Sequence, residues 1–186
     1  NTHTFLAKLI HWTFIPLYAY GIFKQVDDLN ELENASLLNF EILFATVFLI
    51  IVLLRYFYMK DTPALLGAHD AVHKGHLFIA KMVHGLVYFS LVMLPTTGLL
   101  IAALFSLEVG GVEIAIGIHE FSAFLSYVVI ALHVGATLYS RLKGEGLWNA
   151  MVPLWKEKGK NNSNLITKLE VIEEKTYAKI EEILDV

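Results

Sequence analysis

Four long apolar segments restrict the folds that this chain can adopt. Hydropathy places them at about residues 4–23, 37–59, 77–105 and 114–141. Each has about 20 residues or more, which is enough for a helix to cross the ~30 Å hydrocarbon core of a bilayer. Because lipid offers no partner to backbone N–H and C=O groups, a spanning segment must satisfy these groups within itself, as a helix does. We therefore expect an all-α integral membrane protein built on a four-helix transmembrane bundle.

The composition supports this class and excludes several kinds of cofactor site. The chain is 56 % hydrophobic and 17 % charged, whereas a soluble domain has about 25 % charged residues. It contains no cysteine, which excludes disulfides, thiolate metal sites, iron–sulfur clusters and haem attached through a CxxCH motif. The net charge is a weak −4, and the chain has neither a Gly-rich phosphate loop nor a basic aromatic patch, so we expect no nucleic-acid partner.

The charged residues between the apolar segments are distributed unevenly. Residues 24–36 form an acidic loop, and residues 106–113 contain two Glu but no Lys or Arg. The basic residues fall on the other side, at Lys60, Lys74, Arg141, Lys143, Lys156, Lys158 and Lys160. Because Lys and Arg are enriched in cytoplasmic loops, we expect the N-terminus, the 60–76 loop and the C-terminus in the cytoplasm.

The composition changes after residue 143 and divides the chain into three parts. We expect residues 1–143 to form the transmembrane domain, residues 144–160 an interfacial segment, and residues 161–186 a cytoplasmic C-terminal amphipathic helix. This helix would lie on the membrane surface or on the protein's own loops, or it would dock a partner subunit. Its face opposite the apolar stripe is acidic, which disfavours anionic lipid and favours a protein partner.

Two histidines in the fourth segment are the strongest functional signal. His119 and His133 lie 14 residues apart, which is almost four helical turns, so both point from nearly one face, about 21 Å apart along the axis. Ionisable groups inside a membrane helix are costly and indicate function. Their two depths predict two haem irons, one near each membrane surface.

The expected topology shows which polar groups share a depth. His11 and His133 both lie about 10–12 Å below the cytoplasmic surface at 1.5 Å per residue, so they can be the two axial ligands of one inner haem. His119 lies near the outer surface, where Glu41 is the ionisable candidate on another helix. The alternatives are a His bonded to a helix carbonyl or a neighbour and, for His119, solvation at the interface.

Further polar residues lie at the inner level. We expect His84 to contact a haem propionate or line a quinone pocket; packing and iron ligation are the alternatives. Arg55 and Lys81 either extend to lipid headgroups or pair with haem propionates. His69, His73 and His76 have spacings that resemble a zinc site, but their place in a loop favours a solvated surface.

Several of these residues together resemble one family. The first segment has a His-Trp pair, the third has Ala-x-x-x-His-x-x-x-Tyr followed by Leu-Pro-x-x-Gly, and the fourth has His-Glu with a second His 14 residues later. In this order the motifs resemble the prokaryotic cytochrome b561 and hydrogenase b-type cytochrome group. These are four-helix membrane dihaem cytochromes of the bacterial inner (cytoplasmic) membrane. The resemblance covers about residues 5–153 and implies a cytochrome b domain over residues 1–143.

The resemblance also implies a ligand set and one departure from it. It assigns His11 and His133 to the inner haem b, and it assigns the outer haem to an early His of the second segment together with His119. Here that second-segment position holds Glu41. The outer haem would then bind through His119 alone or with Glu41, would be absent, or would take its ligand from another subunit. We expect it to be altered or missing, so that the chain holds one haem b, with two as the alternative.

We therefore expect a b-type cytochrome that transfers electrons between quinone and a redox partner through iron held by His11 and His133, with His119 as a further ligand. It would be an electron-transfer subunit of a quinol-linked oxidoreductase rather than a stand-alone catalyst. The alternative is a membrane anchor or assembly subunit of a larger complex, with one mainly structural haem or none. In that case residues 161–186 would dock the partner.

Overall fold

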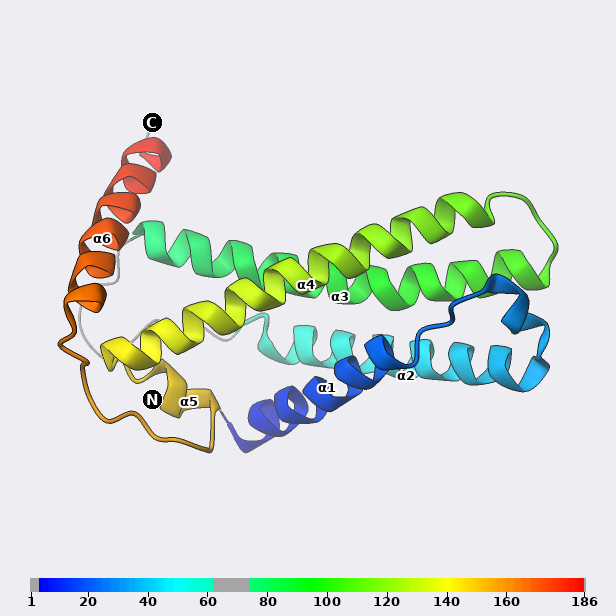
Figure 1. Cartoon of the computed structure of the whole chain (residues 1–186), viewed down its shortest axis with the longest axis horizontal. Coiled ribbons are helices and arrows are strands. Elements are labelled where there is room, and N and C mark those ends of the chain that lie inside the picture. The colour runs from blue at the N-terminus through cyan, green and yellow to red at the C-terminus, as the bar shows by residue number, and fades with distance from the viewer. Residues whose placement is uncertain (1–3, 62–73, 186) are drawn as a thin grey trace. The chain divides into compact units, whose positions relative to one another are not determined.

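The fold is all-helical, as the sequence predicts. The computed structural model describes residues 4–61 and 74–185, and no strand occurs among them. Figure 1 shows the elements in chain order, which are α1 (Phe5–Phe23), the 3-10 helix η1 (Leu29–Glu33), α2 (Ala35–Met59), α3 (Lys74–Ser106), α4 (Val112–Lys143), α5 (Leu147–Met151) and α6 (Asn164–Leu184). The helices α1 to α4 match the four expected segments to within a few residues at each end.

Three of the helices are long and apolar enough to cross a membrane, namely α2, α3 and α4. The fourth expected span, α1, is a helix of 19 residues, but it is not apolar enough to be counted with these three. Lys8 and His11 lie in its first half and lower its mean hydropathy. A membrane protein is therefore supported, whereas the crossing by α1 and a complete four-helix transmembrane bundle remain predictions.

The chain divides into two compact units. Unit 1 comprises Asn1–Thr4, Thr62–Gly85 and Val129–Val186, and unit 2 comprises Phe5–Asp61 and Leu86–Val128. The helices α3 and α4 each contribute to both units, since the boundaries fall within them. The two units are described separately below.

In unit 2, α1 and α2 pack through aromatic side chains and are joined by a capped loop. The rings of Phe14 and Phe48 lie 4.9 Å apart, and Phe48 is buried. In the loop, Asp28 caps η1 through a capping box, and the side chain of Asn34 accepts hydrogen bonds from the first turn of α2. The acidic loop expected from the sequence is thus ordered by its own caps, because these side chains satisfy the free N–H groups at the helix starts.

In unit 1, α6 is fastened to the last turn of α4 through Glu173. Lys143 Nζ lies 2.9 Å from both carboxylate oxygens of Glu173, and the Tyr139 hydroxyl donates to the same carboxylate at 2.8 Å. Burial raises the pKa of Glu173, but the hydrogen bonds from Lys143 and Tyr139 outweigh it, so that the pKa lies below its ordinary value. Glu173 is therefore a charged residue that binds α6 to α4, which we call the Glu173 clamp, and it is not part of a free acidic surface.

A second fastening joins α6 to the start of α3. A Cβ added at Gly75 would lie 2.6 Å from the carbonyl oxygen of Tyr177 and 3.0 Å from its Cα. The Tyr177 ring stacks on His76 with centroids 5.0 Å apart. Glycine at position 75 thus permits an approach between two helix backbones that a larger residue would block.

The segment between α4 and α6 folds around Trp148. The Trp148 indole N–H donates to the Leu154 carbonyl at 2.8 Å, and the Glu157 carboxylate accepts from the Gly146 amide at 2.7 Å. Trp148 is buried whereas Trp155 is 76 % exposed. Trp148 is thus enclosed by its own loop, and the interfacial role of residues 144–160 stays a prediction.

The close approach at Gly75 predicts that Gly75→Ala displaces α6. Both nearest atoms belong to the backbone of Tyr177 and cannot rotate away, so we expect a loss of about 1–3 kcal/mol in stability, as for other overpacked sites. Thermal unfolding followed by circular dichroism would measure it. Gly110→Ala is the matched control, because nothing lies within 4 Å of a Cβ added there; equal losses in both variants would contradict the prediction.

The Glu173 clamp predicts that the fastening of α6 weakens in acid. Because the folded-state pKa of Glu173 lies below its ordinary value of 4.5, the stabilisation is fully present above that value and is lost as the pH falls through the folded-state pKa. Glu173→Gln should cost about 1.5–3 kcal/mol at neutral pH, as expected for hydrogen bonds to a charged group, and little in strong acid. Protease cleavage of α6 across a pH series would measure this. Glu174→Gln is the control, and an equal pH profile for both variants would refute the role of Glu173.

Candidate functional site

His119 is held in unit 2 by hydrogen bonds to α3, to the side chain of Thr97 and to the backbone of Leu94. Its Nδ1 atom lies 2.7 Å from the Thr97 hydroxyl, and Thr97 is buried. Gly98 is the next residue, and a Cβ added there would lie 3.7 Å from His119 Cε1. The ring of His119 therefore lies against a small residue and a buried hydroxyl just after Pro95.

The hydrogen bonds of Thr97 indicate the tautomer of His119. The Thr97 hydroxyl lies 2.7 Å from the Met93 carbonyl oxygen, to which it donates. A hydroxyl has a single proton, so its oxygen must accept from His119 Nδ1–H. The Nε2 atom then carries the lone pair, which is the form of imidazole that binds a metal, with the other nitrogen oriented by an outer hydrogen bond.

Glu41 is engaged by Lys24 rather than by His119. Lys24 and Glu41 form an ion pair in which both side chains are largely buried. The Lys24 ammonium also lies 4.2 Å from the centroid of the Phe44 ring. No contact between Glu41 and His119 occurs among the described residues. A role for Glu41 as a second outer ligand would require its carboxylate to leave Lys24.

Arg55 fixes the turn of α1 that precedes His11. Its Nη1 atom donates to the Ala7 carbonyl at 2.8 Å, and Ala7, one turn before His11, is the most buried residue of α1. Tyr88 forms a side-chain hydrogen bond with Arg55. The His11 ring is half-buried and lies edge-on to Trp12, with centroids 5.9 Å apart. Arg55 thus orients His11 indirectly, through the backbone of its helix.

Unit 1 brings His84 and His133 together. Their ring centroids lie 5.2 Å apart in an edge-on arrangement. Beside them, Gly85 and Gly135 have nothing within 4 Å of an added Cβ. Glycine within a helix lowers its stability, and at these two positions no neighbouring atom would prevent a larger residue. His11 belongs to unit 2, so the expected pairing of His11 with His133 stays a prediction.

The remaining candidates are spread over unit 1. Lys81 is exposed, one helical turn before His84. His76 stacks on Tyr177, whereas His69 and His73 lie outside the described residues. Within residues 4–61 and 74–185, no group of three or more metal-ligating side chains occurs.

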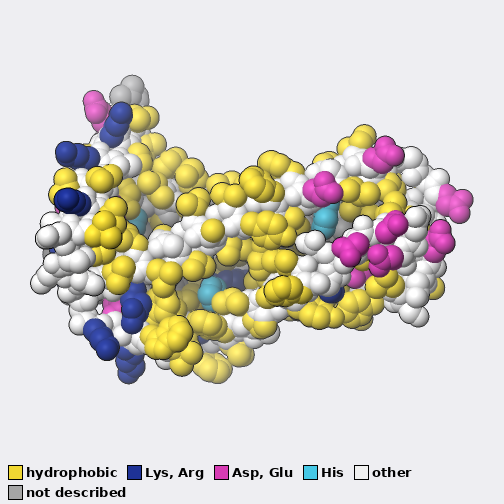
Figure 2. Space-filling view, viewed as in Figure 1, with side chains coloured by type: hydrophobic (Ala, Val, Ile, Leu, Met, Phe, Trp, Pro, Cys, Tyr) yellow, Lys and Arg dark blue, Asp and Glu magenta, His cyan; other side chains and the backbone are white. Residues whose placement is uncertain are grey.

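These residues suit an axially ligated haem better than a polydentate metal ion. His119 presents one oriented imidazole, and the His133 ring lies 5.2 Å from that of His84. Figure 2 shows His side chains set among hydrophobic ones. Haem needs one or two axial ligands and an apolar pocket, whereas a structural zinc ion needs about four ligands. The donor set therefore fits haem, and each of these histidines is by itself a candidate axial ligand.

Sequence analysis did not predict the roles of Thr97, Lys24 and Glu173. Thr97 bonds to His119, Lys24 pairs with Glu41, and Glu173 binds α6 to α4. Thr97 carried a detectable signal, because it is a hydroxyl in an apolar span two residues after Pro95. The pairing of Lys24 with Glu41 had a weaker signal, since Lys24 was counted only as a loop residue. Nothing local to Glu173 distinguishes it from the other glutamates of α6.

Comparison with known proteins gave one match. A family model described as prokaryotic cytochrome b561 matches residues 2–154. The match covers α1 to α5 and all the histidines considered above, and α6 lies beyond it. Neither the curated proteins nor the solved structures gave a match.

The bond between Thr97 and His119 predicts that Thr97→Val releases the tautomer. Valine keeps the shape but cannot accept from Nδ1–H, so we expect a mixture of tautomers and about 10–100-fold weaker binding of a metal at Nε2, the usual cost of losing an outer hydrogen bond. Nitrogen-15 NMR of the imidazoles would report the tautomer.

Thr96→Val is the matched control for this experiment. The neighbouring hydroxyl of Thr96 is exposed and bonds only to the Val92 carbonyl, at 2.7 Å, so its loss should leave His119 unchanged. A single Nδ1–H tautomer that persists in Thr97→Val would show that the hydroxyl does not set it.

Proposed function

The chain belongs to the prokaryotic cytochrome b561 family, whose members are membrane b-type cytochromes of electron transfer, and from this premise we propose that it carries electrons between quinone and a redox partner. The observation that carries the proposal is the family match, because it spans all the helices with the candidate histidines.

At the inner level, His11 and His133 would be the axial ligands of one haem b. Haem, when bound, supplies a one-electron centre whose potential depends on its ligands and on burial. Arg55 supports this assignment because it fixes the turn of α1 before His11. Arg55 and Lys81 are the cations available at this level for haem propionates.

His84 would serve the exchange of protons with quinone. It lies beside His133, with ring centroids 5.2 Å apart, and its side chain is exposed at the surface of unit 1. Imidazole has an ordinary pKa near 6.5, which suits it to accept and release protons near neutral pH. A quinone headgroup that reached His84 would therefore find a proton carrier next to an iron ligand.

At the outer level, we expect a haem site that is altered or missing. Glu41 is neutralised by Lys24, and Lys24 is held over the Phe44 ring. Moving the carboxylate to an iron would leave a largely buried lysine without its partner, which is costly. His119 alone would remain as an outer ligand, so we propose one haem b in this chain, with two as the alternative.

We place the chain in the bacterial inner membrane with both termini in the cytoplasm. Acidic side chains of unit 2 gather over η1 and the loop between α3 and α4, whereas Lys and Arg side chains of unit 1 lie around α5 and α6 (Figure 2). The positive-inside rule then places α5 and α6 on the cytoplasmic side.

The ion pair of Glu41 with Lys24 favours a second function. If the outer level holds no haem, a transmembrane electron path within this chain is incomplete. The chain would then be a membrane anchor or assembly subunit, with residues 161–186 docked on its partner. Rapid reduction of the haem by a quinol in the isolated subunit supports electron transfer, and its absence supports the anchor.

The proposal predicts the haem content of the purified protein and of three variants. The pyridine haemochrome assay should give one haem b per chain. Both His11→Ala and His133→Ala should lose it, because each removes an axial ligand of the same iron, whereas His119→Ala should retain it.

His84→Ala is the matched control, since it removes a neighbouring imidazole at the same depth. It should keep the haem while slowing reduction by quinol. Loss of haem in His119→Ala alone would move the site to the outer level, and a purified protein without haem would overturn the cytochrome assignment.

A further inference from the structure

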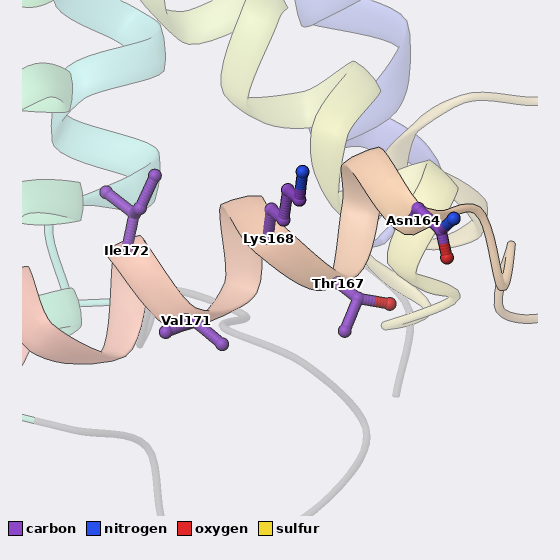
Figure 3. A pocket seen from close by; sticks show the side chains of 5 residues that line it. All are labelled: Asn164, Thr167, Lys168, Val171 and Ile172. Atoms are coloured by element: carbon purple, nitrogen blue, oxygen red, sulfur yellow. The ribbon is translucent and has the colours of Figure 1, made fainter.

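One face of α6 is exposed, apolar and basic. Residues three and four apart on a helix share a face, and this spacing defines what we call the basic stripe: Leu165, Lys168, Ile172, Lys175, Lys179 and Ile183. Its three apolar side chains are between 59 % and 66 % exposed. Figure 3 shows Lys168 and Ile172 pointing to the same side of α6, and Thr167 and Val171 pointing to the other. They line a shallow hollow on this helix, together with Asn164.

The acidic residues of α6 are largely separated from this stripe. Glu173 is bound by Lys143, and Glu170 pairs with Lys160 at 2.9 Å. Glu182 borders the stripe, and Glu174 lies on the opposite face by helical spacing. Among the described residues, none of the three lysines of the stripe forms an ion pair. The acidic character of the sequence therefore describes the fastened side of α6, and the free side carries positive charge.

The position of α6 indicates what covers the stripe. It is fastened to the last turn of α4 and to the first turn of α3, through Glu173 and at Gly75. Figure 1 shows α6 running across the direction of these two helices. Because α3 and α4 are membrane spans, their ends mark the level at which hydrocarbon gives way to headgroups. A helix that lies across span ends at this level, with apolar and lysine side chains exposed, is arranged as an interfacial helix is.

We propose that the basic stripe docks α6 on anionic phospholipid at the membrane surface. The three apolar side chains would enter the boundary of the acyl chains, and the lysines would extend along it to lipid phosphates. The positive charges of Lys175 and Lys179 lie one turn apart and repel each other. An anionic surface would reduce this repulsion, whereas a neutral surface would not. This differs from the expectation of a protein partner, which rested on an acidic face of which Glu173 and Glu170 are paired within the protein, and it does not depend on the haem.

The absence of cysteine from the chain permits a direct test with single labels. Thr176→Cys places a fluorophore beside the stripe, one turn after Ile172, and Glu174→Cys places the same fluorophore on the opposite face. The full chain would be reconstituted in nanodiscs of phosphatidylcholine alone, or of phosphatidylcholine and phosphatidylglycerol in equal parts, with a nitroxide on the lipid headgroup as the quencher.

We expect quenching of the Thr176→Cys label in the anionic discs, less in the neutral discs, and little at Glu174→Cys in either. Changing Lys168, Lys175 and Lys179 to Gln should weaken the docking equilibrium about fivefold for each lysine; the same three changes to Arg should preserve it. The lysines are exposed, so the helical circular dichroism should stay unchanged in both variants.

Three results would overturn the proposal. Equal quenching of the two labels would show that the stripe is not the face toward lipid. Quenching that is the same with and without phosphatidylglycerol, and the same in the Gln variant, would show that anionic lipid is not recognised. A Thr176→Cys label that is shielded from both the lipid quencher and an aqueous one would show that protein, such as a second copy of the chain, covers the stripe.

Discussion

The absence of water from the hydrocarbon core is the constraint on which this structure depends. Every polar group in a span must find its partner within the protein. Several hydroxyls of the spans do so locally, by donating to a carbonyl one turn earlier: Thr46 to Ile42, Thr96 to Val92, Ser122 to Ile118 and Thr137 to His133. Such local bonds use up the hydroxyl protons and leave imidazoles as the main groups in the spans that can bind iron or carry protons.

The same constraint explains how the histidines are prepared without a large polar network. At His119, a hydroxyl that already donates to its own helix can only accept, and this fixes one tautomer. At His11, the orienting group is Arg55, which bonds to the backbone of the helix rather than to the ring. At His119 the imidazole itself is held through Nδ1, whereas at His11 the backbone of the helix is held.

The sequence predicted the elements well because long apolar segments leave few options. The ends of α1 to α4 differ from the expected ones by a few residues, and the rings of His84 and His133, both expected at the inner level, lie 5.2 Å apart. It did not predict partners that are distant in sequence. Thr97 and His119 are 22 residues apart, Lys143 and Glu173 are 30 apart, and neither residue of a pair marks the other locally. The pairing of Glu173 and Glu170 was not predicted for this reason, since charge counted along a helix does not show which glutamates are already bound.

The contact at Gly75 has a consequence for how this chain can change. There, α6 meets α3 backbone to backbone, so the contact does not depend on which side chain stands at position 177. This backbone contact and the carboxylate at position 173 together define a docking position, which helices of many different sequences could occupy. The tail is thus an exchangeable part, whose exposed face can diverge to suit a different membrane while the electron-transfer helices stay as they are.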